Sequence, residues 1–139
     1  MIAADTNVLI YYMLDQPQGS NTSVKKIIRE TKEKLTELFD KKERIALPMP
    51  VLIEFANFAK RRTSKETCNQ IIDSLIADKN FELLPVSQKS AEDAMNLANR
   101  TGTDFSDALI CITMQESGIK SIFTWDSDFE KFKEIEIIR

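Results

Sequence analysis

Residues 1–10 read MIAADTNVLI, an apolar run that is interrupted at Asp5 and resumes at Val8. Residues 1–4 have the length and composition of a short buried strand, and the mostly apolar residues 8–14 have those of a helix packed on a sheet. Asp5 therefore lies where a predicted strand ends and a predicted helix begins. Either it caps the free amides of the first helical turn, or it belongs to a functional site.

The same alternation of strand and helix continues along the whole chain. We predict strands at residues 1–4, 44–48, 81–85, 120–125 and 134–138. We predict a loop at 15–23, whose last residue, Ser23, caps the next helix. We predict helices at 8–14, 23–41, 51–62, 63–76 (with TSKE as a capping box), 87–100 and 104–117, and a turn or short helix at 126–132. Alternating strands and helices form mainly parallel sheets, and nearly all-apolar strands are buried on both faces. The sequence therefore predicts a three-layer α/β/α fold with a central, mainly parallel sheet of four to five strands.

Length and composition favour one globular domain spanning residues 1–139. The 139 residues are 42% hydrophobic, which suffices for a single core, and they include only 3 glycines and 4 prolines. The first apolar run is too short for a signal peptide. No stretch approaches the roughly 20 apolar residues of a membrane span. We therefore expect a cytoplasmic protein without a membrane partner.

The absence of histidine excludes several kinds of active site. With 0 histidines, the chain cannot build a Ser-His-Asp or Cys-His site. The 2 cysteines, Cys68 and Cys111, lie far apart, so we expect both thiols to be buried or idle. Acid-base chemistry near neutral pH must then use carboxylates, Lys or Tyr, or a metal-bound water.

Charge is unevenly distributed along the chain. The formal net charge is -3, but residues 25–65 contain 12 basic and 6 acidic residues. A basic face beside an acidic pocket suits a metal-using enzyme that acts on a polyanion. The alternative is a set of solvated amphipathic helices with mixed charges.

Acidic residues occur at four separate places where they require an explanation. Asp5 and Asp126 each follow a predicted strand, and parallel strands end at the same edge of a sheet. Glu54 lies within the apolar segment VLIEFANFA, so we expect it to be partly desolvated. Asp104 and Asp107 share one face of the predicted helix at 104–117, where Asp104 also fits as an N-cap.

Together these acids predict a metal site. Carboxylates brought close together repel one another, and each takes up a proton or a cation. Mg²⁺ and Mn²⁺ are the divalent ions that prefer oxygen ligands of this kind.

Four motifs carry these acids in a recognisable order. They are DTNVLI at 5–10, PVLIEF at 50–55, DFSDALI at 104–110 and TWDSDF at 124–129. In this order and spacing the sequence resembles the PIN-domain ribonucleases, and most closely the toxins of VapBC-type toxin-antitoxin pairs. The resemblance implies a central parallel sheet, dependence on Mg²⁺ or Mn²⁺, homodimers, and inhibition by a small antitoxin protein.

The resemblance also implies roles for individual residues. The catalytic, metal-binding acids are Asp5, Glu54, Asp107 and Asp126, with Asp104 and Asp128 as accessory acids. Thr6, Asn7 and Thr124 are implied supports for the metal-bound carboxylates. For contact with RNA backbone we single out Lys60, Arg61 and Arg62, with the helix at residues 25–44 as the alternative.

The predicted function is that of a metal-dependent endoribonuclease that hydrolyses RNA phosphodiesters with a metal-activated water, as the toxin of a toxin-antitoxin pair. One alternative is a catalytically silent PIN module that binds RNA or a partner protein. A second is a phosphohydrolase of the haloacid-dehalogenase type. That class requires a second aspartate two residues after the first, where this chain has Asn7.

Overall fold

The computed structural model describes residues 1–14 and 21–139. Within these residues it contains a sheet of five strands, which confirms the predicted α/β class. The strands are β1 (Ile2–Ala4), β2 (Ile45–Pro48), β3 (Phe81–Leu84), β4 (Ser121–Phe123) and β5 (Glu136–Ile138). Their order is β3-β2-β1-β4-β5, and every pair is parallel rather than only most of them.

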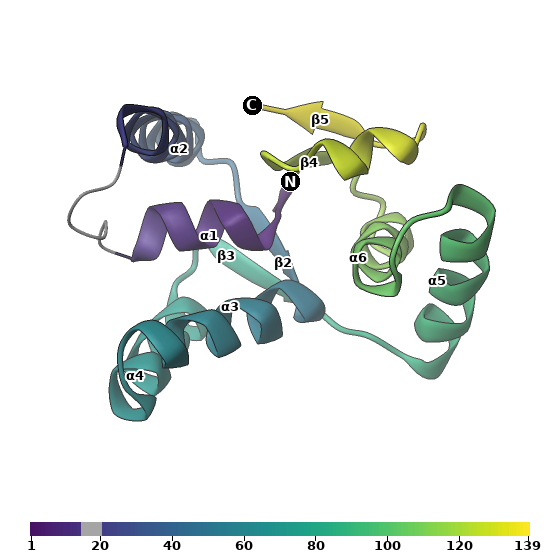
Figure 1. The fold of residues 1–139 in the computed structure, drawn as a ribbon, viewed down its shortest axis with the longest axis horizontal. Coiled ribbons are helices and arrows are strands. Elements are labelled where there is room, and N and C mark those ends of the chain that lie inside the picture. Colours follow the sequence, from purple (N-terminus) through teal and green to yellow (C-terminus); the bar gives the residue numbers. More distant parts are fainter. Residues whose placement is uncertain (15–20) are drawn as a thin grey trace.

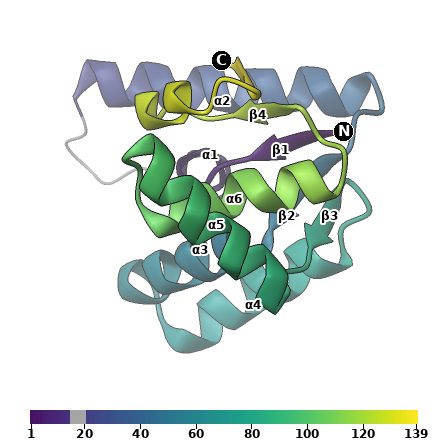
Figure 2. The same ribbon diagram turned by 90° about the vertical axis from the view of Figure 1, so that its right-hand side faces the viewer.

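The helices form the outer two of the three predicted layers. They are α1 (Thr6–Met13), α2 (Thr22–Asp40), α3 (Met49–Arg62), α4 (Lys65–Ala77), α5 (Gln88–Thr101) and α6 (Phe105–Glu116), followed by the short 3-10 helix η1 (Ser127–Lys131). In Figure 1, α1 to α4 lie to the left of the sheet and α5 and α6 to the right. Figure 2 shows α5 and α6 in front of the strands, with the long α2 behind.

The order of the strands creates a switch point between β1 and β4. From β1 the chain crosses over to β2 and then β3, and afterwards it returns by way of α5 and α6 to add β4 on the other side of β1. Ala4 pairs with Phe123, and the amide of Asp5 donates to the carbonyl of Phe123 at 3.0 Å. Because ligands of parallel α/β sheets bind where strand order reverses, this edge is the natural place for a site.

Small residues in the central strands allow helices to pack closely against both faces of the sheet. Ala3, Ala4 and Ala46 are fully buried, as is every residue of β2 to within a few per cent. Seven consecutive residues of α6, from Ala108 to Met114, are also buried. This burial explains the unbroken apolar run that follows Asp107 in the sequence.

The helices predicted from residues 8 and 51 begin two residues earlier, and two predicted N-caps are wrong by one or two residues. Asn21, not Ser23, caps α2, because its side chain accepts a hydrogen bond from the amide of Val24 at 2.8 Å. Ser64, not Thr63, caps α4, because the hydroxyl of Thr63 donates to Ala59 at the end of α3. Residues 15–20 of the predicted loop lie outside the described residues.

No helix in the described part of the chain combines the length and the hydrophobicity that a membrane span requires.

Candidate active site

Asp5 is a buried carboxylate at the switch point, with 6% of its surface exposed. It is the N-cap of α1, where its Oδ1 accepts from the amide of Thr6 at 2.7 Å. Its Oδ2 accepts from the hydroxyl of Thr124 at 2.7 Å and from the side-chain amide of Asn7 at 3.4 Å. Capping therefore accounts for Oδ1 only. Oδ2 is held by Asn7 and by Thr124, which directly follows β4.

Asp126 and Asp128 lie just beyond β4, next to Asp107 at the start of α6. Single carboxylate oxygens of these three residues lie within 4.8 Å of one another. Asp126 is the N-cap of η1 and accepts from the amide of Asp128 at 2.9 Å. Its own amide donates to the hydroxyl of Thr124 at 3.0 Å. Asp128, predicted as an accessory acid, thus lies within the same 4.8 Å limit of Asp107 as Asp126 does.

Asp104 is the N-cap of α6. Its Oδ1 accepts from the amide of Asp107 at 2.9 Å, as the capping interpretation predicts. This hydrogen bond fixes the first turn of α6 and with it the backbone of Asp107. Asp104 therefore has a structural role beside any role toward a metal.

Glu54 is exposed on α3, so the predicted desolvation of its carboxylate is wrong. The apolar residues next to it in the sequence, such as Phe55, occupy the buried face of the helix, while Glu54 lies on another face. No described basic residue pairs with it; instead the hydroxyl of Thr6 donates to its Oε2 at 3.3 Å, and the hydroxyl of Ser106 donates to its Oε1. Two helices therefore hold Glu54 at the site edge with neutral donors.

The acids of the site raise one another's pKa, as is expected of neighbouring negative charges. Burial raises the pKa of Asp5 to about 6 against the hydrogen bonds from Thr124 and Thr6, and the charges of Glu54 and Asp126 add to the increase. Burial likewise raises the pKa of Asp107 to about 7, with further increases from Asp104, Asp5, Asp126 and Glu54. Four segments of the chain thus place their negative charges in one electrostatic neighbourhood.

The donor set fits a hard divalent cation. Three carboxylate oxygens within 4.8 Å of one another, with Asp5 and Glu54 coupled to them, form an all-oxygen arrangement. Among the described residues, no salt bridge reaches any of the six predicted acids. Within that part of the chain, no ion pair therefore offsets their charge.

The sequence analysis did not identify two residues of this site. Ser106 contacts Glu54, and the only signal for it is its position between Asp104 and Asp107 in DFSDALI. Trp125 lies between two site residues, and its backbone amide donates to Asn7 at 3.4 Å. Its apolar side chain suggested only the end of a strand.

The predicted RNA-contacting residues Lys60, Arg61 and Arg62 lie exposed on the last turn of α3. With a rise of 1.5 Å per residue, they are roughly 9 to 12 Å along the helix from Glu54. The guanidinium of Arg62 stacks over Phe58, 5.5 Å from the ring centre. The structure does not bring them into the acid cluster.

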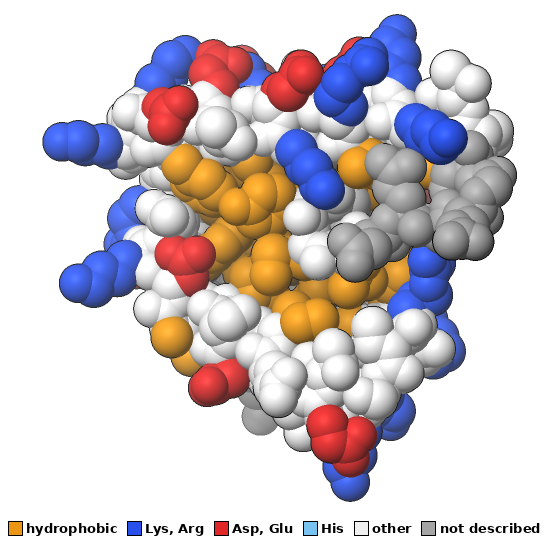
Figure 3. Space-filling model, turned by 90° about the vertical axis from the view of Figure 1, so that its left-hand side faces the viewer, with side chains coloured by type: hydrophobic (Ala, Val, Ile, Leu, Met, Phe, Trp, Pro, Cys, Tyr) orange, Lys and Arg blue, Asp and Glu red, His pale blue; other side chains and the backbone are white. Residues whose placement is uncertain are grey.

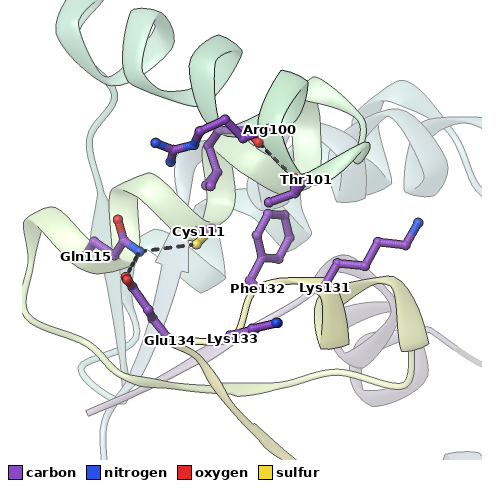
Figure 4. A pocket seen from close by; sticks show the side chains of 9 residues that line it. Arg100, Thr101, Cys111, Gln115, Lys131, Phe132, Lys133 and Glu134 are labelled. Atoms are coloured by element: carbon purple, nitrogen blue, oxygen red, sulfur yellow. Dashed lines mark hydrogen bonds between the residues drawn. The ribbon is translucent and has the colours of Figure 1, made fainter.

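A separate pocket of about 520 Å³ lies between α5, α6 and the segment that follows η1. Figure 4 shows Arg100, Lys131 and Lys133 around it, while Glu134 accepts a hydrogen bond from Gln115. None of the predicted acids is among its described lining residues. Burial raises the pKa of the Cys111 thiol in its wall to about 12, and Cys68 is buried too, in agreement with the expectation of two idle thiols.

Fold and site together define a class: parallel α/β proteins with a carboxylate cluster at the switch point of the sheet. Comparison with protein families identifies the family, because residues 2–135 match the PIN domain. The chain belongs to the PIN-domain family. A comparison with curated proteins finds no match.

Several solved structures share the fold at low sequence identity. A toxin-antitoxin complex from Klebsiella pneumoniae superposes with a TM-score of 0.69 at 19% identity, covering 100% of this chain and 97% of the other. VapBC2 from Rickettsia felis, bound to a DNA fragment from its promoter, gives 0.69 at 18% identity, with coverage of 99% and 98%. VapC20 from Mycobacterium tuberculosis, a toxin that cleaves the sarcin-ricin loop, gives 0.69 at 18% identity, with coverage of 94% and 93%.

Proposed function

We propose that residues 1–139 form a single nuclease domain that hydrolyses RNA phosphodiesters with the aid of Mg²⁺ or Mn²⁺. The observation that carries this proposal is the carboxylate cluster of Asp107, Asp126 and Asp128, coupled to Asp5 and Glu54. Membership of the PIN-domain family supports it. The similarity to a toxin that cleaves the sarcin-ricin loop supports RNA as the substrate class.

Asp5, Asp107 and Asp126 would hold the cation, with Asp128 and Glu54 completing its surroundings. A bound Mg²⁺ or Mn²⁺ lowers the pKa of a water molecule and offsets negative charge on a phosphodiester. The chain itself supplies the orientation: Thr124 and Asn7 hold one oxygen of Asp5, and the Asp104 cap fixes the backbone of Asp107.

Water as the nucleophile determines the products. Attack by water on phosphorus, with the bond to the 3′-oxygen breaking, leaves a 5′-phosphate and a 3′-hydroxyl, and the 2′-hydroxyl of the RNA takes no part. With 0 histidines, the chain lacks the imidazole pair that would activate that 2′-hydroxyl. Cleavage products that end in 2′,3′-cyclic phosphate would contradict this route.

The basic residues near the site provide two candidate surfaces for the RNA backbone. One is the predicted group Lys60, Arg61 and Arg62 at the end of α3. The other is the pocket in Figure 4, where Lys131 lies on the same 3-10 helix as Asp128, roughly 6 Å along its axis. In the described residues, none of the three cations of that pocket forms a salt bridge.

We further propose a small antitoxin as partner of this chain. Figure 3 shows hydrophobic side chains gathered in a hollow on the side of α1 to α4, with both basic and acidic side chains around it. Partly buried hydrophobic residues on these helices include Ile10, Met13, Ile71 and Ile72. An apolar hollow with a charged border suits the apolar face of an amphipathic segment.

A homodimer is the second proposed assembly. Met95 on α5 and Phe105 on α6 are 46% and 41% exposed, and they line one shallow apolar surface with Ala91. Exposed aromatic and methionine side chains that lie together are typical of protein interfaces.

The cytoplasmic location expected from the sequence stays a prediction.

The decisive experiment measures cleavage of structured RNA by the purified protein, freed of any bound partner, in Mn²⁺ and in Mg²⁺. EDTA and Asp107→Asn should each abolish cleavage, whereas Asp73→Asn, a change at an exposed acid on α4, should not. Cleavage that survives EDTA and Asp107→Asn would contradict metal-dependent hydrolysis. RNA binding without any cleavage would favour the silent module.

The phosphohydrolase alternative is disfavoured by Asn7, whose side-chain amide donates to Asp5 where that class requires an acid.

A further inference from the structure

Trp125 connects the acid cluster to a helix that contributes no acid to it. It is the only tryptophan in the chain, and it lies between Thr124, which holds Asp5, and Asp126. Its indole Nε1 donates to the hydroxyl of Thr31 at 2.9 Å. Thr31 belongs to α2, 94 residues earlier in the chain. The hydrogen bond therefore joins the end of β4 to the middle of α2.

The position and hydrogen bonding of Thr31 suit it to accept the hydrogen bond from the indole. It is fully buried on the apolar face of α2, where Ile28 and Leu35 flank it. Its hydroxyl proton is used in a hydrogen bond to the carbonyl of Ile27 at 2.7 Å, which leaves the oxygen lone pairs to accept from the indole. Leaving a partly buried indole N–H without a partner costs free energy, so this contact fixes the ring.

The backbone next to Trp125 connects the fixed indole ring to the acids of the site. The amide of Trp125 donates to Asn7 Oδ1 at 3.4 Å, and Asn7 Nδ2 donates to Asp5 at 3.4 Å. Trp125 lies at a bend after β4, directly between Thr124 and Asp126, so a fixed indole ring also restrains the backbone of these two neighbours. The Thr124 hydroxyl donates to Asp5 and accepts from the amide of Asp126.

We propose that Thr31 and Trp125 are positioning residues, which hold the segment from Thr124 to Asp126 in the geometry that binds the divalent ion. The affinity of the site for metal then depends on α2, although α2 supplies no ligand. This inference rests on the proposed metal-dependent function.

The test compares Thr31→Val with a matched control on the same helix. Thr36 forms the same kind of hydrogen bond, from its hydroxyl to the carbonyl of Lys32 at 2.8 Å, but it is exposed and has no recorded long-range partner among the described residues. Thr31→Val should weaken Mn²⁺ binding, measured by calorimetry, about tenfold, as loss of an outer partner of metal ligands typically does. Thr36→Val should leave the affinity unchanged, and Thr31→Ser, which keeps the hydroxyl, should restore it.

A second readout needs neither metal nor activity. Because Trp125 is the only tryptophan, all indole fluorescence reports its surroundings. Acrylamide should quench this fluorescence at least about twofold more efficiently in Thr31→Val than in Thr36→Val, because the released ring moves more freely. Trp125→Phe, which keeps the packing and removes the N–H, should weaken Mn²⁺ binding as much as Thr31→Val does.

The outcomes separate this inference from the function on which it rests. Equal Mn²⁺ affinity and equal quenching in Thr31→Val and the unaltered protein would overturn the positioning role and leave the proposed nuclease intact. Failure of the unaltered protein to bind Mn²⁺ would overturn both. If Thr31→Val loses its fold, judged by circular dichroism, the comparison of Trp125→Phe with the unaltered protein decides.

Discussion

Acidic side chains have opposite surroundings on the outer surface of α2 and at the carboxyl edge of the sheet. On α2, acids alternate with bases: Glu37 pairs with Lys41 at 2.6 Å and with Lys34 at 3.7 Å, and these contacts lower its pKa. At the sheet edge, acids lie beside acids, neutral donors hold them, and the pKa of Asp5 and of Asp107 is raised. The first arrangement serves solubility. The second has excess negative charge that a cation would offset.

The largest expected effect comes from removing one site charge while keeping its shape. Asp5→Asn should lower the rate of RNA cleavage at least 100-fold, because the variant loses a proposed metal ligand whose outer partners alone are worth 10-fold to 100-fold. Its fold should persist, since asparagine also caps helices well. Steady-state cleavage and thermal unfolding measure the two effects. Loss of the fold together with retained metal binding would favour pure capping.

A somewhat smaller effect is expected from Thr124→Val. The variant keeps the volume of the side chain but deprives the buried Asp5 of its shortest side-chain hydrogen bond and Asp126 of an acceptor for its amide. We expect Mn²⁺ affinity to fall about tenfold and stability to fall by about 1 to 3 kcal/mol. Thr124→Ser should recover most of both. Calorimetry and chemical denaturation provide the measurements, and equal values for Val and Ser would contradict a role for the hydroxyl.

The pH dependence of stability should distinguish the two regions without any RNA. Folding raises the pKa of Asp5 and Asp107 from the model-compound value of 3.8 to about 6 and about 7. The folded state then binds protons more tightly than the unfolded state, so the metal-free protein should lose stability as the pH rises from about 4 to about 7. Mn²⁺ should reverse much of the loss at pH 7. Melting curves in EDTA at several pH values test this, and Asp107→Asn should flatten the profile.

The smallest effect is expected on α2. Glu37→Gln removes a charge that is fully solvated and paired only along the helix, so the melting temperature should stay within about 2 °C. Cleavage of RNA should be unchanged. A marked loss of activity in this variant would break the comparison, because it would show that the charges of α2 also serve the site.

The parts of this architecture that depend on local patterns could be predicted from the sequence. Apolar runs separated by helical segments predicted the sheet, and aspartates at two strand ends predicted that Asp5 and Asp126 would meet. The parts that depend on three-dimensional neighbours could not. Periodicity cannot show that Glu54 is exposed, since its neighbours in the sequence are apolar while its own helical face is not. The bond between Trp125 and Thr31 joins residues 94 positions apart and leaves no trace in either segment.

Capping motifs show the same limit at shorter range. Both Thr63 and Ser64 are acceptable N-caps, and the choice of Ser64 depends on the hydroxyl of Thr63 being used by the preceding helix. Three of the site acids, Asp5, Asp104 and Asp126, are themselves N-caps. Structural and functional interpretations of an aspartate at a helix start are therefore compatible, and a sequence alone does not separate them.

The pairing of β1 with β4 has a consequence for biosynthesis. The hydrogen bond between Asp5 and Thr124 spans 119 residues, so β1 meets this partner only after β4 has been synthesised. Contacts of such sequence separation form late, because the intervening chain must first be ordered. A nascent chain that ends before Asp126 would lack part of the proposed metal site. The order of the strands would thus keep the proposed site incomplete until β4 and the residues that follow it have been synthesised.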